Sequence, residues 1–530
     1  MRRLVSLLRQ VRGHNDRGRA FRAEEAAVAR ATAAPTVDER FRRAMENAQA
    51  SPSVLLGNAV RDPSLEVRLT LAEILAHAMV LGATGSGKTR LVARVVTFLL
   101  REIARDPAAL GLALLDFKGE FANLVAELTA DLLDELPPAQ AQRLMDRWVV
   151  FNPFSTSSLL PMQILLRDPS VAPEIQAAEL TSVVERMGGA ALGVKQDSFT
   201  YNVLLFGILE ELDMLELRRL LADLPALEAR ARGSSSAEVR ESLGSATKLQ
   251  RASLEGVLAR FDRLLRPPSM RLMLGARTCV SFRNIVGSKI LLADVGSPPL
   301  GLSDLTSFWA GFLMMKLTRS VFERTRADAA RPVLVFADEW QVGLGAGPDV
   351  ADEFERVLAL ARSREVHLWM ISQSMTGAMK VSASLPEIVA TNTTIQVLGR
   401  AAIKDARLMS HLLPVTGRLR RPAPGPWDIP PRSPFLTPSE EKDRLVEDVT
   451  NQPARTFYLL DRRRPSRAEL VRAATIEPNV QSFRNPGEWQ RLRDGALGVP
   501  IVRLEAEAHR KKTETFEPAR PTLVGPRRRP

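Results

Sequence analysis

The chain has little cysteine, histidine and lysine, and each shortage excludes a class of site. Among 530 residues there is one cysteine, Cys279, so neither a disulfide framework nor a cysteine-rich zinc site can form. Five histidines without an HExxH motif argue against a metal centre built by the protein alone. Only 11 lysines accompany 62 arginines, a skew that a GC-rich coding sequence can produce as readily as function can.

Long apolar runs are also lacking. No stretch reaches the ~18–20 uninterrupted apolar residues that a membrane-spanning helix needs. The two best candidates, residues 91–100 and 308–315, are short, and Arg94 interrupts the first. Near the N-terminus, Arg9 and Arg12 end an apolar run too early for a signal-peptide core. We therefore expect a cytoplasmic protein with no transmembrane segment of its own.

The sequence does contain enough apolar residues for several folded units. A hydrophobic fraction of 45 % excludes a mostly disordered chain. From residue 77 onward, short apolar segments alternate with helical stretches, a pattern typical of a parallel sheet with helical crossovers. The predicted strands of this α/β fold are residues 78–82, 112–117, 149–151, 289–295, 333–337, 367–372 and 394–398.

One block breaks the alternation. Residues 170–270 hold long Leu/Ala/Glu/Arg segments at helical spacing, which predicts an all-helical domain inserted between two strands. A Gly-Ser-Ser-Ser stretch at 233–236 is expected to be a flexible joint inside it. The predicted organisation begins with a basic helical arm (1–50) and the first part of an α/β domain (51–169), which opens with β-like residues 53–70. The insertion (170–270) follows. The second part of the α/β domain (271–480) contains an extended Pro-rich loop (417–438), and a basic C-terminal tail (481–530) ends the chain.

The strongest motif is a phosphate-binding loop. Residues 82–89 read Gly-Ala-Thr-Gly-Ser-Gly-Lys-Thr and satisfy GxxxxGK[ST], with an apolar strand before them and an amphipathic helix after them. Backbone N–H groups of such a loop surround phosphates, and the helix N-terminus adds partial positive charge. Lys88 would reach the β- and γ-phosphates and Thr89 would ligate Mg²⁺, so ATP and Mg²⁺ are the predicted cofactors. The predicted nucleotide-binding residues are Gly82, Ala83, Thr84, Gly85, Ser86, Gly87, Lys88, Thr89 and Arg90.

A second motif supplies acids. Residues 333–339, Val-Leu-Val-Phe-Ala-Asp-Glu, predict a buried strand that carries two carboxylates to the phosphate side of a sheet. Asp338 would hold the Mg²⁺ shell and Glu339 would polarise the attacking water. An apolar run that ends in Asp-Glu is common by itself, and its pairing with a phosphate loop favours the functional interpretation. The Glu after the Asp favours hydrolysis over transfer to another substrate.

Two other strands end in polar residues. Gln373 follows the strand 367–372, and a Gln at the tip of a strand beside that of Asp338 can touch both the γ-phosphate and the lytic water. It is a candidate sensor of nucleotide state, and the alternative is a cap on the next turn. Asp116 and Lys118 end the second strand, where they either lie near the nucleotide or pair with each other.

These motifs together resemble the FtsK–HerA superfamily of ring-forming DNA pumps and, within it, the type IV coupling proteins of bacterial conjugation. Residues 77–89 are similar to that family's nucleotide loop, including the preceding histidine. Residues 116–120, Asp-Phe-Lys-Gly-Glu, resemble its Asp-Pro-Lys-Gly-Glu motif with Phe117 in place of Pro. Phe-Asn-Pro-Phe at 151–154 resembles the segment before the family's helical insertion, and the acid pair and Gln373 match its remaining motifs.

The resemblance implies a RecA-like P-loop ATPase that assembles into a homo-oligomer, a hexameric ring, with ATP sites between subunits. It implies DNA, single- or double-stranded, threaded through a central channel. It further implies an arginine that reaches the γ-phosphate across each interface, and the candidates here are Arg362, Arg364 and Arg400.

The sequence departs from coupling proteins in one respect, because those proteins usually begin with two membrane-spanning helices. The chain could dock at the inner membrane through a partner, such as a relaxosome or a secretion channel. It could instead be a soluble HerA-like motor that works with a nuclease in DNA end processing or defence. A secretion-type ATPase acting on protein cargo, and a nucleotide-gated adaptor, are further alternatives.

The formal net charge of +12 lies at the two ends of the sequence. Residues 1–22 carry +6 and residues 509–530 carry +5, so the remainder is nearly neutral. The basic pI therefore describes the ends of the chain, and the argument for DNA rests on the motifs.

We predict that deleting residues 1–22 and 509–530 lowers affinity for DNA or for anionic membrane and leaves basal ATP hydrolysis intact, because the surplus charge is electrostatic and remote from the motifs. Binding titrations and a steady-state ATPase assay check this. Loss of basal hydrolysis would contradict the separation of roles.

Overall fold

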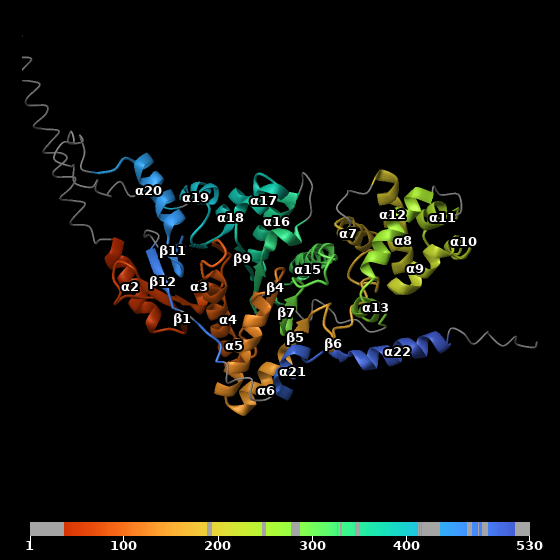
Figure 1. Cartoon of the computed structure of the whole chain (residues 1–530), viewed down its shortest axis with the longest axis horizontal. Coiled ribbons are helices and arrows are strands. Elements are labelled where there is room, and N and C mark those ends of the chain that lie inside the picture. Colours follow the sequence, from red (N-terminus) through yellow and green to blue (C-terminus); the bar gives the residue numbers. More distant parts are fainter. Residues whose placement is uncertain are drawn as a thin grey trace, which may run out of the picture.

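The computed structural model gives the chain one large sheet with helices on both sides (Figure 1). It describes residues 37–187, 193–245, 251–276, 287–325, 327–328, 331–344, 350–411, 413, 415, 435–463, 469–474, 476–479 and 486–514. Cys279, residues 1–36 of the predicted arm and residues 417–434 of the predicted Pro-rich loop lie outside this part.

Eleven strands form the sheet, in the order β2-β1-β12-β11-β10-β3-β9-β8-β4-β7-β5. The seven strands from β10 to β5 are parallel, and each predicted strand is confirmed to within one residue at either end. They are, in sheet order, β10 (Ile395–Leu398), β3 (Ala78–Leu81), β9 (Val366–Ser372), β8 (Val333–Asp338), β4 (Gly111–Asp116), β7 (Ile290–Asp294) and β5 (Trp148–Phe151).

Both faces of the parallel strands are buried, which is why these segments read as continuous apolar runs. Successive residues alternate between two apolar clusters, so that Leu81 and Ala337 face one side while Val80 and Phe336 face the other. Helices on the first side are α15 (Asp304–Glu323), α16 (Val350–Ser363), α17 (Met375–Val381), α18 (Leu385–Asn392), α19 (Ile403–Ser410) and α20 (Pro438–Asn451). Helices on the second side are α2 (Val37–Gln49), α3 (Leu71–Ile74), α4 (Lys88–Arg105), α5 (Phe121–Glu135), α6 (Pro138–Arg147) and α21 (Pro486–Asp494).

Four antiparallel strands extend the sheet beyond β10. The β-like residues 53–70 form two of them, and two more come from the C-terminal part of the chain, where the sequence reading placed none. These strands are β2 (Glu66–Thr70), β1 (Ser53–Ala59), β12 (Glu469–Ala473) and β11 (Thr456–Asp461). The antiparallel strands therefore connect segments from the N-terminal and C-terminal parts of the described chain to the parallel strands.

Between β6 (Ser158–Leu159) and β7 every described element is a helix, as predicted for the insertion. The helices are α7 (Pro173–Glu185), α8 (Val194–Leu209), α9 (Met214–Ala222), α10 (Leu224–Ala231), α11 (Ala237–Leu243), α12 (Arg251–Leu264) and α13 (Pro268–Leu274). The expected flexible joint at 233–236 is instead a folded turn. Ser234 is buried, its carbonyl accepts a hydrogen bond from Arg240 Nη1 at 2.6 Å, and Ser236 caps α11.

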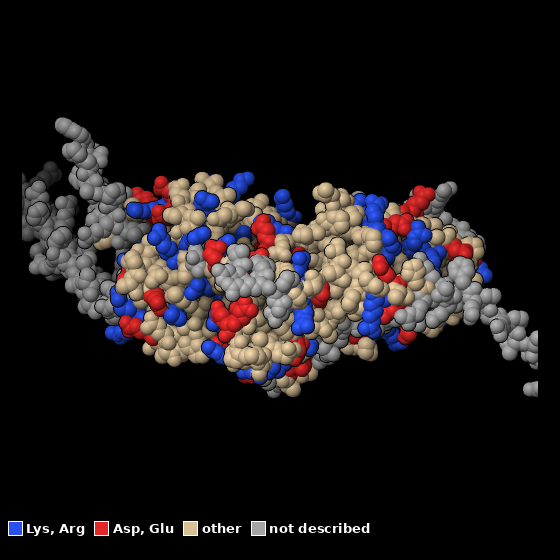
Figure 2. All heavy atoms as spheres, turned by 60° about the horizontal axis from the view of Figure 1, so that its bottom comes forward, with Lys and Arg blue, Asp and Glu red and all other residues tan. Residues whose placement is uncertain are grey.

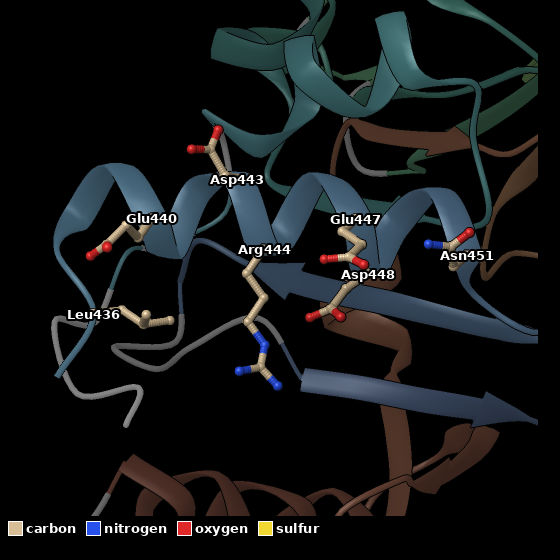
Figure 3. Close-up of a pocket in the computed structure, with 7 residues that line it drawn as sticks. All are labelled: Leu436, Glu440, Asp443, Arg444, Glu447, Asp448 and Asn451. Atoms are coloured by element: carbon tan, nitrogen blue, oxygen red, sulfur yellow. The ribbon is translucent and has the colours of Figure 1, made fainter. Parts of the chain in front are cut away.

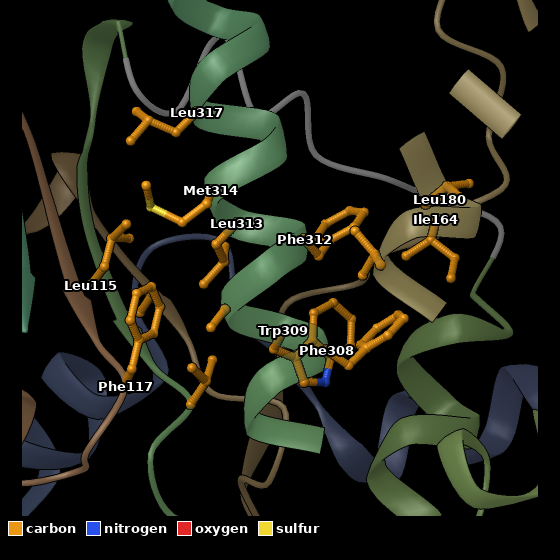
Figure 4. Close-up of a cluster of buried hydrophobic side chains, with 14 of the residues drawn as sticks. Leu115, Phe117, Ile164, Leu180, Phe308, Trp309, Phe312, Leu313, Met314 and Leu317 are labelled. Atoms are coloured by element: carbon orange, nitrogen blue, oxygen red, sulfur yellow. The ribbon is translucent and has the colours of Figure 1, made fainter. Parts of the chain in front are cut away.

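Helix α15 fastens the insertion to the sheet. Figure 4 shows it between Leu115 and Phe117 on the sheet side and Ile164 and Leu180 on the insertion side. Trp309 is fully buried there and meets neighbouring aromatic rings edge to face, with ring centroids 5.0 to 5.5 Å apart. Such packing makes one continuous core of the insertion and the first side of the sheet.

The predicted C-terminal tail is in part folded. Helix α21 packs on α5 and β5, and Trp148 Nε1 donates a hydrogen bond to Leu492 O at 2.8 Å. Strand β13 (Val499–Pro500) then pairs with β6, and α22 (Ile501–Glu514) contacts α13. The prediction failed because the arginine-rich composition masked a few buried apolar anchors.

On the face shown in Figure 2, basic and acidic side chains are interspersed and form no field of one sign. This agrees with the nearly neutral charge of the sequence between its two ends. Among the described helices, none is long and apolar enough to cross a membrane.

Arg147 links the amino ends of several strands. Its guanidinium is buried and donates to three backbone carbonyls, Ser288 O at 2.9 Å, Pro107 O at 2.7 Å and Leu110 O at 2.9 Å. Burial lowers its pKa to about 10.

We predict that Arg147→Met lowers the free energy of unfolding by about 2–4 kcal/mol, because it leaves buried carbonyls without donors. Urea unfolding followed by tryptophan fluorescence measures the change. The matched variant Arg143→Met removes an exposed arginine with one 3.4 Å contact and should change stability by less than about 0.5 kcal/mol. Equal effects of the two variants would contradict this role of Arg147.

Candidate nucleotide-binding site

The parallel strands bring the predicted site residues to one edge of the sheet. In the register of β3 with β9, Leu81 lies opposite Ser372, and in that of β8 with β9, Asp338 lies opposite Ile371. The phosphate loop, the acid pair and Gln373 therefore follow three neighbouring strands at their carboxyl ends. In an open α/β sheet this edge is where ligands bind.

The phosphate loop has the curled backbone that its glycines permit. Gly85 and Gly87 have φ of +76° and +96°, values that favour glycine. Ser86 N–H donates to Ala83 O at 3.0 Å, which closes the turn. Lys88 opens α4 with 5 % of its surface exposed, so its ammonium group is held at the edge of the sheet.

Asp338 is a buried acid that lacks a full set of partners. Its residue is 3 % exposed, and its Oδ1 accepts no hydrogen bond. Burial raises its pKa to about 7, and the negative charges of Asp116 and Glu339 act in the same direction. Burial lowers the pKa of Lys88, which the charges of Asp338 and Glu339 oppose. A buried carboxylate oxygen with no donor fits a cation ligand, so Asp338 and Thr89 could hold Mg²⁺.

Glu339 is held in a strained conformation at the tip of β8. Its φ of +55° is uncommon for a residue with a side chain and costs about 1–3 kcal/mol. Its carboxylate accepts from Gln373 N–H at 3.2 Å and from Gln341 Nε2 at 2.6 Å. These two donors hold the carboxylate beside the end of β9.

Gln373 joins the phosphate loop to the acid pair. Its side-chain Oε1 accepts from Thr84 Oγ1 at 2.9 Å, while its backbone N–H contacts Glu339. The helix α17 that follows is capped by Ser374, whose Oγ accepts from Thr376 N–H at 3.0 Å. Capping of that turn is therefore done by the neighbouring serine and not by Gln373.

Asp116 and Lys118 do not pair with each other through their side chains. Asp116 is fully buried and accepts backbone N–H groups of Lys118, Gly119 and Ala122 at 2.9, 2.7 and 2.8 Å. The ammonium group of Lys118 contacts Glu120 at 2.8 Å. Asp116 thus shapes the turn after β4, and its charge reaches the nucleotide site by raising the pKa of Asp338.

Asp294 is a further acid at this edge that the sequence reading missed. It lies opposite Asp116 in the register of β4 with β7, as Asp338 does on the other side. Burial and the charge of Asp116 raise its pKa to about 6, and Asn152 Nδ2 donates to its Oδ2 at 3.1 Å. The signal was present, because Asp294 ends an apolar run as the other two acids do.

The three candidate arginines lie in different places. Arg362 and Arg364 precede β9, so they lie at the amino edge, the length of a seven-residue strand or about 20 Å from Gln373. Arg364 also donates to Arg324 O. Arg400 follows β10 beside the phosphate loop, where its carbonyl accepts from Ala83 N–H at 2.7 Å. Of the three, Arg400 is the one that this chain brings to its own site.

A fourth arginine reaches the loop from the antiparallel strands. Arg455 N–H donates to Ser86 O at 2.8 Å, and the residue has a left-handed φ of +64°. Its guanidinium lies 3.9 Å from Glu477, which also pairs with Arg90. No local pattern marks Arg455, because its place depends on the pairing of β11 with distant strands.

A separate hollow of about 600 Å³ runs along α20 (Figure 3). Its lining is mostly acidic and comprises Leu436, Glu440, Asp443, Arg444, Glu447, Asp448 and Asn451. It contains none of the predicted site residues.

We predict that Asp338→Asn stabilises the nucleotide-free and magnesium-free protein more at pH 8 than at pH 5. The folded-state pKa of Asp338 is about 7, above its ordinary value of 3.8, so the wild type loses stability as pH rises through this interval, whereas Asn cannot ionise. The gain at pH 8 should be on the order of 2–4 kcal/mol. Thermal unfolding at both pH values measures it, with the exposed Asp146→Asn as control. A gain that does not depend on pH would contradict the raised pKa.

Comparisons with known proteins agree with this geometry. Residues 54–276 match the family model of the central domain of the helicase HerA, a region that includes the phosphate loop and the helical insertion. Asp338, Glu339 and Gln373 lie outside the matched residues. No curated protein matches the chain by sequence.

Three solved structures show a more distant likeness. Plasmid coupling protein TrwB in complex with ADP and Mg²⁺ is 16 % identical, with a TM-score of 0.49 over 79 % of this chain and 90 % of that one. VirB4 of Thermoanaerobacter pseudethanolicus is 11 % identical, with a TM-score of 0.49 over 81 % and 98 %. The cytoplasmic domain of the type VII secretion ATPase EccC of Thermomonospora curvata is 14 % identical, with a TM-score of 0.28 over 82 % and 30 %.

The family match covers the same strand–loop–helix unit that carries the phosphate loop in the sequence and in the fold. Residues 54–276 are therefore similar to the central domain of the helicase HerA.

Proposed function

We propose that the chain is an ATP-driven DNA translocase that works as a homo-oligomeric, hexameric ring. The observation that carries the proposal is the convergence of the phosphate loop, Asp338, Glu339 and Gln373 at one sheet edge. DNA as the track rests on the resemblance of the motif set to DNA pumps. A secretion-type ATPase for protein cargo is the alternative that the test below distinguishes.

The chemistry proposed is attack of water on the γ-phosphate of ATP. Two hydrogen-bond donors hold the Glu339 carboxylate, so it can orient the attacking water and accept its proton as a general base. Lys88 and the N–H groups of the loop would hold the phosphates. Thr89 and Asp338 would hold Mg²⁺, which when bound offsets phosphate charge. Gln373 contacts Thr84 and Glu339 together and is suited to sense whether the γ-phosphate is present.

A ring would complete the site with charge from a neighbouring subunit. Arg362 is exposed at the edge opposite the phosphate loop, so it could serve only another subunit's nucleotide. Arg400 lies beside the loop of its own chain and could act without assembly. Catalysis by a neighbour's arginine would make ATP turnover depend on protein concentration below the assembly threshold.

Two kinds of cellular partner would suit this translocase. A relaxosome or secretion channel would fit transfer of DNA, with the chain at the inner membrane through that partner, and a nuclease would fit end processing or defence.

We predict that Glu339→Gln lowers kcat for ATP hydrolysis by at least about 100-fold while retaining nucleotide binding, because the amide keeps the shape of the side chain and removes the base. Lys88→Ala should lose binding as well. Fluorescent-nucleotide titration and phosphate release measure the two effects. The exposed Lys195→Ala in α8 serves as the matched lysine control. Full activity of Glu339→Gln would overturn the assigned site.

The translocase itself is tested with DNA. The wild-type full chain should hydrolyse ATP faster when single- or double-stranded DNA is added. If neither form raises turnover while unfolded protein substrates do, the secretion-type alternative replaces the DNA pump.

A further inference from the structure

A groove lies between α17 and α19, next to the segment that starts at Gln373. Its volume is about 540 Å³. The residues that line it are Thr376, Met379, Lys380, Lys404, Asp405, Arg407, Leu408 and His411. Helix α17 forms one wall of the groove, and it begins two residues after Gln373.

The groove is rimmed by cations from both helices. Lys380, Lys404 and Arg407 are exposed, and none of them forms an ion pair within the part of the chain that the structure describes. Lys442 on α20 approaches His411 Nδ1 at 3.3 Å and extends the basic rim. Three of the 11 lysines of the sequence therefore gather at this place. Lysine is a minor cation in this chain, so the cluster does not follow from composition.

The only acid in the lining is already engaged. Asp405 is 3 % exposed, and its two oxygens accept from Ser374 Oγ at 2.8 Å and from Met375 N–H at 3.0 Å. Its charge is thus directed at the start of α17 and away from the rim. The same two bonds tie α19 to the two residues that follow Gln373.

A continuous path joins the groove to the nucleotide site. Thr84 of the phosphate loop contacts Gln373, and Gln373 N–H contacts Glu339. Ser372 Oγ in turn donates to Ser374 O at 2.9 Å. A shift of Gln373 with nucleotide state would move Ser374 and, through Asp405, the rim residues of α19.

We propose that the groove between α17 and α19 binds the phosphodiester backbone of nucleic acid, and that Asp405 is the positioning residue that couples this contact to the nucleotide site. The inference rests on the proposed function and names the surface through which it acts. Lysine and arginine heads bind phosphate oxygens regardless of base sequence, as a track-following motor requires. The apolar lining residues Met379 and Leu408 offer no base-specific hydrogen bond.

The first test removes the rim charge. In the triple variant Lys380→Ala, Lys404→Ala, Arg407→Ala, the slope of log affinity for duplex DNA against log salt should become shallower by about 2–3, at ~0.9 per lost phosphate contact. The stimulation of ATP hydrolysis by DNA, taken as the ratio of stimulated to unstimulated rate, should fall at least about 10-fold. Fluorescence anisotropy across a salt series and a coupled ATPase assay measure both.

A matched control keeps the change of net charge equal. The variant Lys195→Ala, Arg219→Ala, Arg266→Ala removes three exposed cations from the helical insertion and should leave slope and stimulation unchanged. If the control lowers both as much as the rim variant does, general surface charge binds the DNA and the groove assignment is overturned.

The second test addresses the coupling. Ser374→Ala removes the hydroxyl that donates a hydrogen bond to Asp405. The variant should keep its affinity for DNA and lose the stimulation of ATP hydrolysis by DNA. Ser374→Thr retains the hydroxyl and should restore stimulation. Asp405→Ala leaves the Ser374 cap of α17 in place and removes only the acceptor on α19, so it should lose stimulation as Ser374→Ala does, which loss of the cap alone would not produce. Loss of affinity and stimulation together in Ser374→Ala, without rescue by Thr, would contradict the positioning role.

The response of the wild type to DNA distinguishes failure of the translocase proposal from failure of the groove assignment. If wild-type turnover does not respond to single- or double-stranded DNA, the translocase proposal fails and this inference fails with it. If the wild type responds and the rim variant responds equally, the translocase stands and the groove assignment alone is wrong.

Discussion

The candidate site depends on one constraint, the common edge at which parallel strands end. Because β3, β9 and β8 are neighbours in register, a loop, an amide and two carboxylates that are distant in sequence meet without any further element. At this edge Asp116 lies between two other acids, and burial together with its negative charge raises the pKa of Asp294 and of Asp338. A magnesium ion with its nucleotide would relieve the charge at Asp338.

The same edge explains how the site could act at a distance. Glu339 is fixed by strain and by two donors, whereas Gln373 contacts both the phosphate loop and Glu339 and continues into α17. Asp405 then joins α17 to α19 by two hydrogen bonds. Small displacements at a packed edge pass to rigid helices because the interior is close-packed. The basic rim lies at the far end of this chain of contacts.

Much of the fold and site could be predicted because the signals are local. The apolar strands fixed the seven parallel elements, and the loop at 82–89 identified the nucleotide site. Strands β11 and β12 were missed because their antiparallel pairing with strands distant in the sequence has no local signal, although Thr456–Asp461 is itself an apolar run. Arg455 was missed for the same reason. The folding of residues 486–514 was not predicted because charged residues separate the six apolar side chains that join the core, which are Trp489, Leu492, Leu497, Val499, Ile501 and Leu504. A highly charged composition indicates that most side chains are solvated, but it does not show whether a helix packs against the rest of the fold.

The measurement that tests the central claim most directly is hydrogen–deuterium exchange of the wild-type chain with ADP and with a non-hydrolysable ATP analogue. We predict slower exchange with the analogue in residues 373–381 and 403–410, since the γ-phosphate would order Gln373 and, through Ser374 and Asp405, helices α17 and α19. Helix α9 in the insertion should exchange equally in both states. Identical exchange of α17 and α19 with both nucleotides would contradict the link between the nucleotide site and the groove.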